Sequence, residues 1–401
     1  MTGRDNRLSL YVHVPFCDVK CGYCDFNSYA GLDSLMPAYT DALLEEIRRW
    51  SPHARGYTVH TVFFGGGTPS LLPPACLERI LAAIRDAFTL DAAPEISLEA
   101  NPGTVDEGRL RHLRALGITR LSLGVQSFHD DELAALDRIH SAADVAAAYA
   151  AARAAGFENV NLDLIFGLPG QTLERWEHNV RRALALRPEH LSLYALTVEE
   201  GTPLASQVRR GLVPAPDPDL QAEMYERADA LLAESGYLQY EISNWSLPGR
   251  ACRHNLTYWE NRPYLGLGPG AHSCFGGRRF SVVRSPRAYV RALTPGGDGM
   301  PQIEWEETLD PATEMAETVI LGLRLADGVS LPAFQARFGV SLPAVYGDAV
   351  RELTDLGLLE AAGGRLRLTR RGRLLANEAF LRFLPDPPAV TPTGTPSAAA
   401  P

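Results

Sequence analysis

The chain has 401 residues, a formal net charge of −10 and 46% hydrophobic residues. This length suits roughly two to three domains, and the acidic balance excludes a global electrostatic attraction to nucleic acid. No apolar run reaches the length of a membrane span and no secretory signal precedes the first apolar stretch, Leu8 to Val14. We therefore expect a cytoplasmic protein with reduced cysteines and no integral membrane segment.

Short β-branched runs alternate with longer amphipathic stretches as far as about Ala195. The runs predict six strands, at Ser9–Val14, Val59–Phe64, Glu95–Glu99, Arg120–Gly124, Asn159–Ile165 and His190–Tyr194. The stretches between them predict helices over Pro37–Trp50, Pro74–Phe88, Asp106–Leu116, Asp130–Gly156 (two helices) and Thr172–Leu186. Strands separated by helices indicate a parallel sheet with right-handed crossovers. Six such units without a break favour a partial or complete (β/α) barrel.

Polar and glycine-rich segments follow the ends of these predicted strands. In strand order they are the cysteines Cys17, Cys21 and Cys24, the turn Gly65–Thr68, then Glu99, Gln126 and Asp163. The strand-to-helix loops of a barrel converge at its C-terminal rim. We therefore predict that these residues form one site.

The pattern changes beyond Gly201, and we divide the chain accordingly. The predicted parts are a barrel core (1–200), a segment that completes the barrel (201–293), a linker (294–312), a helical, winged-helix-like C-terminal domain (313–384) and a disordered tail (385–401). The C-terminal domain carries the arginines Arg365, Arg367, Arg370, Arg371 and Arg373. A basic winged helix suggests nucleic-acid binding, but the acidic chain favours a solvated face or a lid, and we expect no nucleic-acid partner.

The cysteine triplet Cys17-x3-Cys21-x2-Cys24 indicates metal or cluster ligation in a reducing compartment. Thiolates are the natural ligands of iron–sulfur clusters, and three of them leave one corner of a cubane cluster open. The alternative is a structural zinc site with His13 as fourth ligand. Such sites usually pair two cysteine hairpins, and Cys252 is remote, so we place zinc second. Cys76, Cys252 and Cys274 receive no role.

The triplet, with Tyr23 before its last cysteine, resembles the signature of the radical S-adenosylmethionine (SAM) superfamily. Further motifs resemble the oxygen-independent coproporphyrinogen III oxidase family and, within it, the heme chaperone HemW branch. They are Tyr11-Val-His-Val-Pro-Phe-Cys17, Gly65-Gly-Gly-Thr-Pro69, Gly124-Val-Gln-Ser-Phe128 and Asp163-Leu-Ile-Phe-Gly-Leu-Pro-Gly-Gln171. The resemblance implies a partial (β/α)6 TIM-like radical SAM barrel that holds a [4Fe–4S] cluster and SAM.

Matching motif to motif, the resemblance also implies which residues contact SAM. Tyr11, Gly66 and Glu99 would contact the cluster-bound molecule, and His272 would lie near its adenine. A second SAM would be contacted by Tyr23, Gly67, Thr68, Gln126, Arg138, Asp163 and Thr197. Two alternatives stay open: Gln126 and Asp163 could simply close the rim by hydrogen bonds, and Arg138 could be solvated.

Departures from the oxidase pattern bear on function. Phe26 stands where the oxidase signature has a fourth cysteine, and only ten residues precede Tyr11. Both features argue against coproporphyrinogen decarboxylation and for a chaperone that binds heme and transfers it to acceptor proteins. The alternatives are a catalytic radical SAM oxidase acting on coproporphyrinogen III or a related tetrapyrrole and, further behind, a zinc-stabilised binding module. The sequence leaves open whether the protein is an enzyme and whether it cleaves SAM. It also leaves open which acceptor receives the heme, which electron donor serves the cluster, and whether the protein forms a homodimer.

A final motif, His254-Asn255-x2-Tyr258-Trp259, matches the chaperone branch. Imidazole is a common axial ligand of heme iron, so His254 is the heme-ligand candidate. The alternative is a core histidine hydrogen-bonded to Tyr258, with Trp259 filling space.

Overall fold

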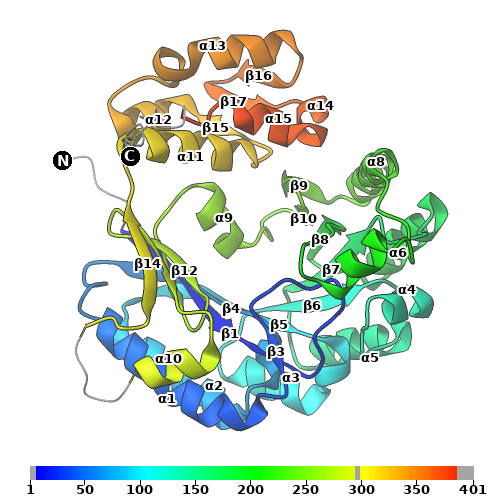
Figure 1. Cartoon of the computed structure of the whole chain (residues 1–401), viewed down its shortest axis with the longest axis vertical. Coiled ribbons are helices and arrows are strands. Elements are labelled where there is room, and N and C mark those ends of the chain that lie inside the picture. The colour runs from blue at the N-terminus through cyan, green and yellow to red at the C-terminus, as the bar shows by residue number, and fades with distance from the viewer. Residues whose placement is uncertain (1–5, 294–298, 386–401) are drawn as a thin grey trace, which may run out of the picture.

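The computed structural model describes residues 6–293 and 299–385 (Figure 1). Residues 294–298 of the predicted linker and the predicted tail beyond residue 385 lie outside the described residues, as do residues 1–5. No helix in the described part of the chain is long and apolar enough to cross a bilayer.

Six parallel strands form the centre of the molecule, as the alternation of strands and helices predicts. They are β1 (Arg7–Val14), β4 (Thr58–Gly66), β5 (Leu90–Ala100), β6 (Arg120–Gln126), β7 (Val160–Phe166) and β8 (His190–Ala195). The crossover helices are α1 (Met36–Trp50), α2 (Pro74–Ala87), α3 (Glu107–Ala115), α4 (Asp130–Ala135), α5 (Ala142–Ala154) and α6 (Leu173–Leu186). Each strand pairs with the next in chain order, which is the arrangement of a βα barrel.

The alternation of side chains along β1 shows how the sequence positions the site. Leu8, Leu10 and Val12 are fully buried in the hydrophobic core. The residues between them, Tyr11 and His13, line cavities on the other side of the sheet. Because successive strand residues face opposite sides, one face of each strand packs while the other supplies polar groups to the barrel interior.

The sheet continues beyond the six central strands on both edges. On one side β11 (Tyr264–Leu267) runs parallel to β1, followed by antiparallel β12 (His272–Phe275), β13 (Arg278–Val282) and β14 (Ile303–Thr308). On the other side lie β10 (Asn244–Ser246) and β9 (Leu238–Glu241). The order ends at β14 and β9, so no strand pairing among the described residues closes this sheet, and α9 (Arg253–Trp259) lies between the two edges (Figure 1).

Strand β14 lies inside the segment predicted to be a linker. Ile303 to Thr308 pair with β13 at the exposed edge of the sheet. The proline and glycine residues before this strand obscured its pattern, and here the linker prediction is wrong. The remaining short elements are β2 (Phe16–Cys17), β3 (Tyr29–Ala30), α7 (Pro203–Arg209), α8 (Pro218–Glu234), α10 (Pro286–Ala292) and the 3-10 turns Asp33–Leu35, Pro69–Leu71 and Pro102–Thr104.

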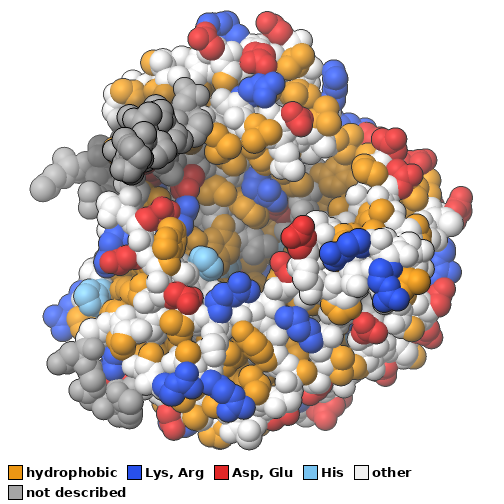
Figure 2. Space-filling view, viewed as in Figure 1, with side chains coloured by type: hydrophobic (Ala, Val, Ile, Leu, Met, Phe, Trp, Pro, Cys, Tyr) orange, Lys and Arg blue, Asp and Glu red, His pale blue; other side chains and the backbone are white. Residues whose placement is uncertain are grey.

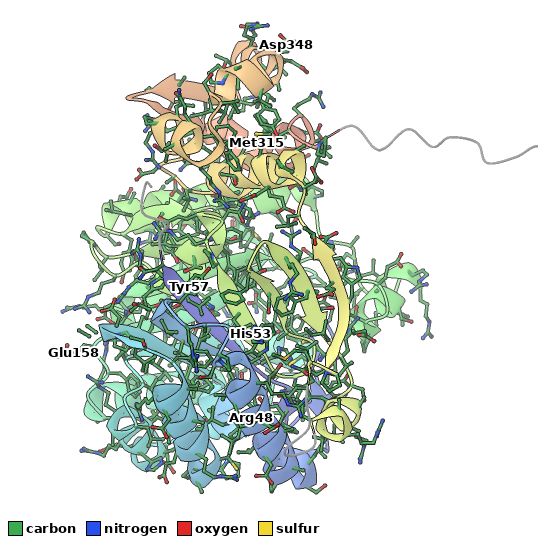
Figure 3. All side chains as sticks on the ribbon, turned by 90° about the vertical axis from the view of Figure 1, so that its left-hand side faces the viewer. Arg48, His53, Tyr57, Glu158, Met315 and Asp348 are labelled. Carbon is green, nitrogen blue, oxygen red and sulfur yellow. The ribbon has the colours of Figure 1, made fainter. Side chains whose placement is uncertain are left out.

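The C-terminal unit has the element order of a winged helix. Its elements are α11 (Pro311–Leu323), β15 (Val329–Ser330), α12 (Leu331–Phe338), α13 (Leu342–Asp355), β16 (Leu359–Ala362), β17 (Arg365–Leu368), α14 (Arg370–Leu374) and α15 (Ala376–Leu381). The three strands form a separate small sheet, and the unit has its own hydrophobic cluster around Phe334, Leu353 and Phe383. In Figure 3, Met315 and Asp348 mark this unit above the barrel, on which Arg48 is labelled.

Polar contacts attach the C-terminal unit to both edges of the large sheet. Arg279 on β13 donates to both carboxylate oxygens of Glu317 at 2.6 Å each. Near the opposite edge, Arg373 donates to Gln239 Oε1 at 2.7 Å. The unit therefore spans the open side of the barrel, and the face between the two is hollowed (Figure 2).

The arginines of this unit do not form an unpaired basic edge. Arg367 pairs with Glu360 at 2.6 Å and Arg370 with Glu226 of α8 at 3.4 Å. Arg365 and Arg371 donate to backbone carbonyl oxygens of their own unit. Their contacts fit the alternative of a solvated, structural face.

Candidate functional site

The three cysteines lie together in the loop that follows β1. Cys17 ends β2, and the backbone N–H of Cys24 donates to the carbonyl oxygen of Cys21 at 3.1 Å. Two side chains from other loops contact the thiols: Thr68 Oγ1 lies 3.6 Å from Cys17 Sγ, and Arg138 Nη1 lies 3.5 Å from Cys21 Sγ. These contacts hold the cysteine loop against the loops that follow β4 and α4.

A cavity of about 370 Å³, here called the cluster cavity, gathers the predicted rim residues. Its lining includes Cys17, Cys21, Cys24, Tyr23, Gly66, Gly67, Thr68, Glu99, Gln126, Arg138, Asp163 and Thr197. These residues come from the C-terminal ends of successive strands, as expected for a barrel rim.

The glycines beside the cysteines leave room that any other residue would fill. A Cβ at Gly67 would lie 2.5 Å from the carbonyl oxygen of Phe16 and 3.0 Å from Cys17 Sγ. Gly66 has φ +115°, and a Cβ there would lie 2.6 Å from a ring carbon of His13. The space and the three half-buried thiols fit a cluster held at three corners.

The zinc alternative needed His13 as a fourth ligand. Both ring nitrogens of His13 have partners: Nδ1 lies 3.0 Å from Tyr11 Oη, and Nε2 lies 2.9 Å from the carbonyl oxygen of Asn27. With both ring nitrogens engaged, His13 is not available to complete a tetrahedral zinc site with the three cysteines.

The rim polar groups are bound to one another, as one of the two sequence interpretations expected. Asp163 accepts hydrogen bonds from Ser122 Oγ at 2.9 Å and Asn161 Nδ2 at 2.8 Å, and burial raises its pKa. Asp163 thus closes the rim and lines the cavity at once. Gln126 has φ 66°, a left-handed conformation that is uncommon outside glycine and often marks functional sites.

Arg138 is not a solvated surface residue, so that alternative is wrong. Its Nη2 donates to Asn101 Oδ1 at 2.5 Å and to the carbonyl oxygen of Gly124 at 2.8 Å. Asn101 was missed at the sequence level, yet its Nδ2 also donates to Thr68 Oγ1 at 3.0 Å. Its position directly after the third strand, like that of the other rim residues, was the available signal.

Glu99 lines the cluster cavity and also the two neighbouring cavities described below. Its Oε2 accepts from the backbone N–H of Gly66 at 3.1 Å. Burial, with a smaller contribution from the Asp163 carboxylate, raises the pKa of Glu99 to about 8. The carboxyl is therefore held partly protonated near neutral pH until a ligand supplies donors or positive charge.

Tyr11 and His272 lie outside the cluster cavity. They line a second cavity of about 680 Å³, here called the hairpin cavity because β12 and β13 form one wall. It shares Phe26, Gly66 and Glu99 with the cluster cavity. Tyr11 and His272 therefore line a cavity next to the one that contains the cysteines, and not the cluster cavity itself.

His254 lies in a third, smaller space of about 190 Å³ inside the barrel, here called the interior cavity. The ring is buried, and both nitrogens have partners: Nδ1 lies 2.8 Å from Thr61 Oγ1, and Nε2 lies 2.9 Å from Tyr258 Oη. Burial lowers the pKa of His254 to about 3. The contacts match the alternative of a hydrogen-bonded core histidine, and Trp259 packs under the guanidinium of Arg324.

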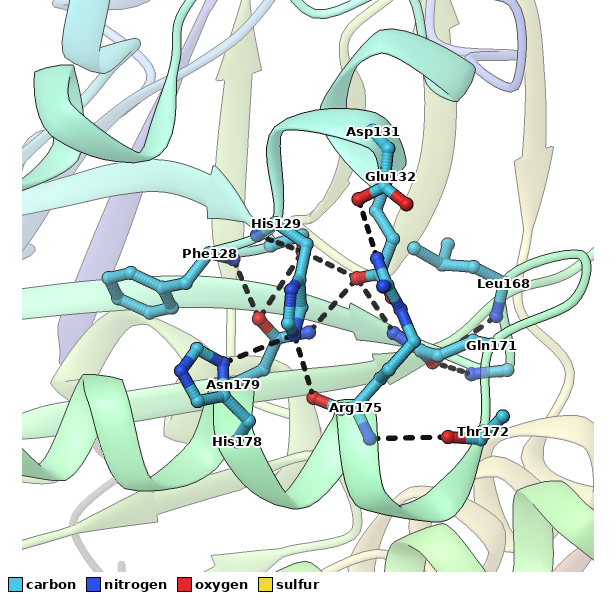
Figure 4. Close-up of polar contacts among 12 residues, drawn as sticks. Phe128, His129, Asp131, Glu132, Leu168, Gln171, Thr172, Arg175, His178 and Asn179 are labelled. Carbon is cyan, nitrogen blue, oxygen red and sulfur yellow. Dashed lines mark hydrogen bonds and ion pairs between the residues drawn. The ribbon is translucent and has the colours of Figure 1, made fainter.

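A buried carboxylate fixes the loops that carry the rim residues (Figure 4). Glu132 on α4 accepts from Ser127 Oγ at 2.5 Å, Arg175 Nε at 2.8 Å and Gln171 Nε2 at 3.1 Å. Gln171 in turn accepts from the backbone N–H of Gly167 at 2.9 Å. The network therefore joins the loop after β6 to the loop after β7, which positions the cavity wall from behind.

Burial alone would raise the pKa of Glu132. The hydrogen bonds from Ser127 and Arg175 outweigh burial, so the pKa lies below the ordinary value of a glutamate. The carboxylate is therefore charged in the folded chain and contributes to its stability.

Comparison with protein families gives two matches. Residues 11–183 match the radical SAM superfamily, and residues 309–375 match the HemN C-terminal domain. The first match contains the cysteine loop and nearly all rim residues, and the second falls on the C-terminal unit.

Individual proteins are similar over almost the whole chain. A protein named heme chaperone HemW from Mycobacterium tuberculosis is 43% identical, over 94% of each chain. A protein of the same name from Bacillus subtilis is 37% identical, over 94% of this chain and 99% of its own. Among solved structures, coproporphyrinogen III oxidase HemN from Escherichia coli, described as a radical SAM enzyme, superposes with a TM-score of 0.82 at 26% identity, over 94% of this chain and 89% of its own.

Proposed function

This chain belongs to the radical SAM superfamily and, within it, to the family of proteins named heme chaperone HemW, and on that premise we propose that it binds heme and transfers it to acceptor proteins. The observation that carries the proposal is identity of 43% over 94% of both chains to a protein of that name. Similarity of that extent includes both the barrel and the C-terminal unit, so the proposal does not rest on the shared cysteine motif alone.

A [4Fe–4S] cluster at Cys17, Cys21 and Cys24 is the second part of the proposal. When bound, such a cluster offers an open iron to the amino and carboxyl groups of SAM and an electron for cleaving its C–S bond. The protein orients SAM and shields it. Gly66 and Gly67 admit the ligand close to the backbone, and Glu99 would accept hydrogen bonds from its ribose hydroxyls.

The rim residues hold the cavity ready for these ligands. Arg138 and Thr68 each donate toward one cysteine sulfur and so hold the cysteine loop at the cavity wall. Burial raises the pKa of Cys17 and Cys24, so these thiols need the charge of the iron to stay ionised.

The competing function is oxidation of coproporphyrinogen III or a related tetrapyrrole. The fold similarity to the oxidase favours it. Against it stands Phe26, which occupies the position of the oxidase family's fourth cysteine and is 64% exposed at the cavity wall. A phenyl ring cannot replace a thiolate, whereas it can pack on a macrocycle.

The experiment compares delivery with turnover in one preparation. The full chain, reconstituted anaerobically with iron and sulfide, is loaded with heme, freed of excess heme, and mixed with an apo-cytochrome acceptor. We expect a Soret band on loading, transfer of heme to the acceptor, and no carbon dioxide from coproporphyrinogen III with SAM and reductant. Decarboxylation with stoichiometric 5′-deoxyadenosine, without heme transfer, would establish the oxidase instead.

A further inference from the structure

Arg120 is a buried cation that no protein group neutralises directly. The residue is 2% exposed, and its Nε has no hydrogen-bond partner. Among the described residues, no carboxylate lies within ion-pair distance of its guanidinium and no acceptor bonds to it. A guanidinium keeps its charge at any physiological pH, and a buried charge without a partner destabilises a fold. An anion bound beside Arg120 would remove that cost.

Arg120 faces the barrel interior from the end of β6 that is opposite to the rim. Leu121 and Leu123 are buried in the hydrophobic core. Arg120 and Ser122 alternate with them, so they point to the other side of the sheet, and both line the interior cavity. Gln126 ends β6 at the rim, roughly 20 Å from the start of the strand at about 3.3 Å per residue. The predicted SAM contact on β6 is therefore remote from the Arg120 backbone.

Two carboxylates act electrostatically on Arg120, but their oxygens are engaged elsewhere. Glu95 Oε2 and Oε1 accept from the backbone N–H groups of Arg253 and His254 at the start of α9, at 3.1 Å each. Asp163 accepts one hydrogen bond at each oxygen from side chains of its own and the neighbouring strand. Neither carboxylate therefore bonds to the guanidinium.

The charge balance of the interior cavity favours an anion. Burial raises the pKa of Asp163 and, with a smaller contribution from that carboxylate, raises the pKa of Glu99 to about 8. Glu99 is therefore largely protonated near neutral pH. Burial lowers the pKa of His254 to about 3, so its ring is neutral. Among the described residues that line the cavity, Arg120 alone is a permanent cation.

The size and walls of the cavity indicate which anion fits. Its volume of about 190 Å³ is below the roughly 300–1,000 Å³ typical of whole-ligand sites, so it suits a small anion or one arm of a larger ligand. Phe63 and Tyr258 line it and offer apolar surface to a short carbon chain. A single guanidinium matches one carboxylate, which it can bind through two parallel hydrogen bonds.

The way into the interior cavity leads from the cluster cavity. Glu99, Asp163 and Tyr194 line both spaces. A carboxylate that reaches Arg120 therefore passes the rim, and a ligand seated at the rim can extend an acidic arm toward Arg120.

We propose that the interior cavity is a carboxylate subsite with Arg120 as its anchor. The carboxylate belongs either to a free short-chain acid or to an acidic arm of a larger ligand at the rim, such as a heme propionate. The proposal goes beyond heme binding, because the subsite requires only a carboxylate and the charge of Arg120.

The first test titrates the full-length, cluster-reconstituted protein with sodium propionate and with propionamide, which has a similar shape and no charge. Ligand-observed NMR measures both affinities. The variants are Arg120→Gln and the control Arg111→Gln, which removes an exposed arginine of α3. Wild type and control should bind propionate in preference to the amide, and Arg120→Gln should bind propionate at least about tenfold more weakly.

Stability and SAM affinity show whether the Arg120 variant is intact. Because the substitution removes a buried charge without a partner, the thermal midpoint of Arg120→Gln without propionate should not fall below that of wild type. Propionate should raise the midpoint of wild type and leave that of the variant unchanged. SAM affinity should stay within about twofold, as expected for a remote contact. Arg120→Lys keeps the charge without the fork and should recover part of the propionate binding.

Ferric heme and heme dimethyl ester identify the carrier of the carboxylate. If a heme propionate occupies the subsite, Arg120→Gln weakens heme by about tenfold and leaves the ester unchanged, because the ester has no carboxylate. If a free short-chain acid is the occupant, the variant loses propionate binding and keeps the wild-type affinity for both heme and ester.

The proposal is overturned if Arg120→Gln matches wild type for propionate and for heme. It is also overturned if the variant weakens SAM as much as propionate, since Arg120 would then belong to the SAM site. Failure of the proposed heme function is a distinct result, because a wild-type chain that binds no heme can still distinguish propionate from propionamide.

Discussion

The interior cavity and the hairpin cavity are neighbours that share Tyr11, Glu99 and Tyr258, yet they hold their histidines in opposite states. His254 in the interior cavity is buried with both ring nitrogens bonded. His272 in the hairpin cavity is exposed, and its ring has no hydrogen-bond partner among the described residues. A motif identifies an imidazole, but only the folded surroundings decide whether its nitrogen is free to bind a ligand.

The same contrast distinguishes the barrel's open rim from the packed regions around it. At the rim, thiols, glycines and Glu99 surround open space and depend on ligands for their final state. In the packed regions, groups such as Glu132 and His254 are satisfied by protein partners. Substitutions at the rim should therefore change ligand binding with little cost in stability, whereas substitutions in the packed regions should do the reverse.

The largest expected effect is on the cluster. Cys21→Ala removes one of three ligands at a half-exposed position, so the reconstituted variant should lose its cluster iron and sulfide while staying folded. Iron and sulfide analysis with circular dichroism measures both. Cys76→Ala, a buried cysteine of α2, is the control and should keep a full cluster. A Cys21→Ala protein with a wild-type iron content would refute the assignment of the rim site.

The two histidines should differ sharply in what they contribute to stability. His254→Ala leaves Tyr258 Oη without its partner, removes one of the two partners of Thr61 Oγ1 and opens space, at a cost of about 2–4 kcal/mol in the free energy of unfolding. His272→Ala, at an exposed position, should cost less than about 0.5 kcal/mol. Urea unfolding of the cluster-free chains measures both. Equal losses would contradict the contrast between the bonded, buried His254 and the exposed His272.

Glu132→Gln tests the packed network behind the rim. The amide nitrogen would replace one of the two oxygens, so it would face either Arg175 or the donors Ser127, Gln171 and Asn179, and we expect a loss of about 1–3 kcal/mol at pH 7. The folded pKa of Glu132 is lowered, so its stabilisation is complete above the unfolded value of about 4.3 and is lost as pH falls through the folded pKa. The stabilities of the variant and the wild type should therefore converge in acid. If the free energies of unfolding of the two proteins differ by the same amount at every pH, the shape of the Glu132 side chain, and not its charge, stabilises the network.

Glu99→Gln should change stability in the opposite direction, by raising the free energy of unfolding. The folded pKa of Glu99, about 8, exceeds the unfolded value of about 4.3, so this group makes the fold less stable as pH rises between the two values. Discounted for the water that reaches the cavity, the variant should gain about 1–2 kcal/mol at pH 8 in the cluster-free chain. Isothermal titration should show weaker SAM binding in the reconstituted variant. A less stable variant would mean that Glu99 is structural.

The fold was largely predictable because its signals are local. Each of the six parallel strands reads as a short apolar run, and each crossover helix as a longer stretch between two runs, so the local pattern recovers their order. Strand β14 was missed because it is an exposed edge strand, with one partner and three glutamates. It forms through pairing with β13, a contact that no local pattern encodes.

The sequence predicted which residues line the candidate site, but not which hydrogen bonds those residues make. Topology brings strand ends together, so Cys17, Glu99 and Asp163 could be assigned to one rim from sequence order. Arg138 contacts Asn101 and His254 contacts Thr61, and each of these partners lies more than 35 residues away in the chain. Whether a polar side chain is satisfied or free depends on such contacts, and for this reason the sequence motif could suggest His254 as a heme ligand.

The most direct test of the radical SAM assignment is EPR of the anaerobically reconstituted, dithionite-reduced protein, recorded with and without SAM. We expect a [4Fe–4S]⁺ signal whose g values shift when SAM is added, because the three thiolates leave one iron open to it. A protein with no such signal that binds stoichiometric zinc, or a cluster signal that SAM leaves unchanged, would contradict the open-iron site at Cys17, Cys21 and Cys24.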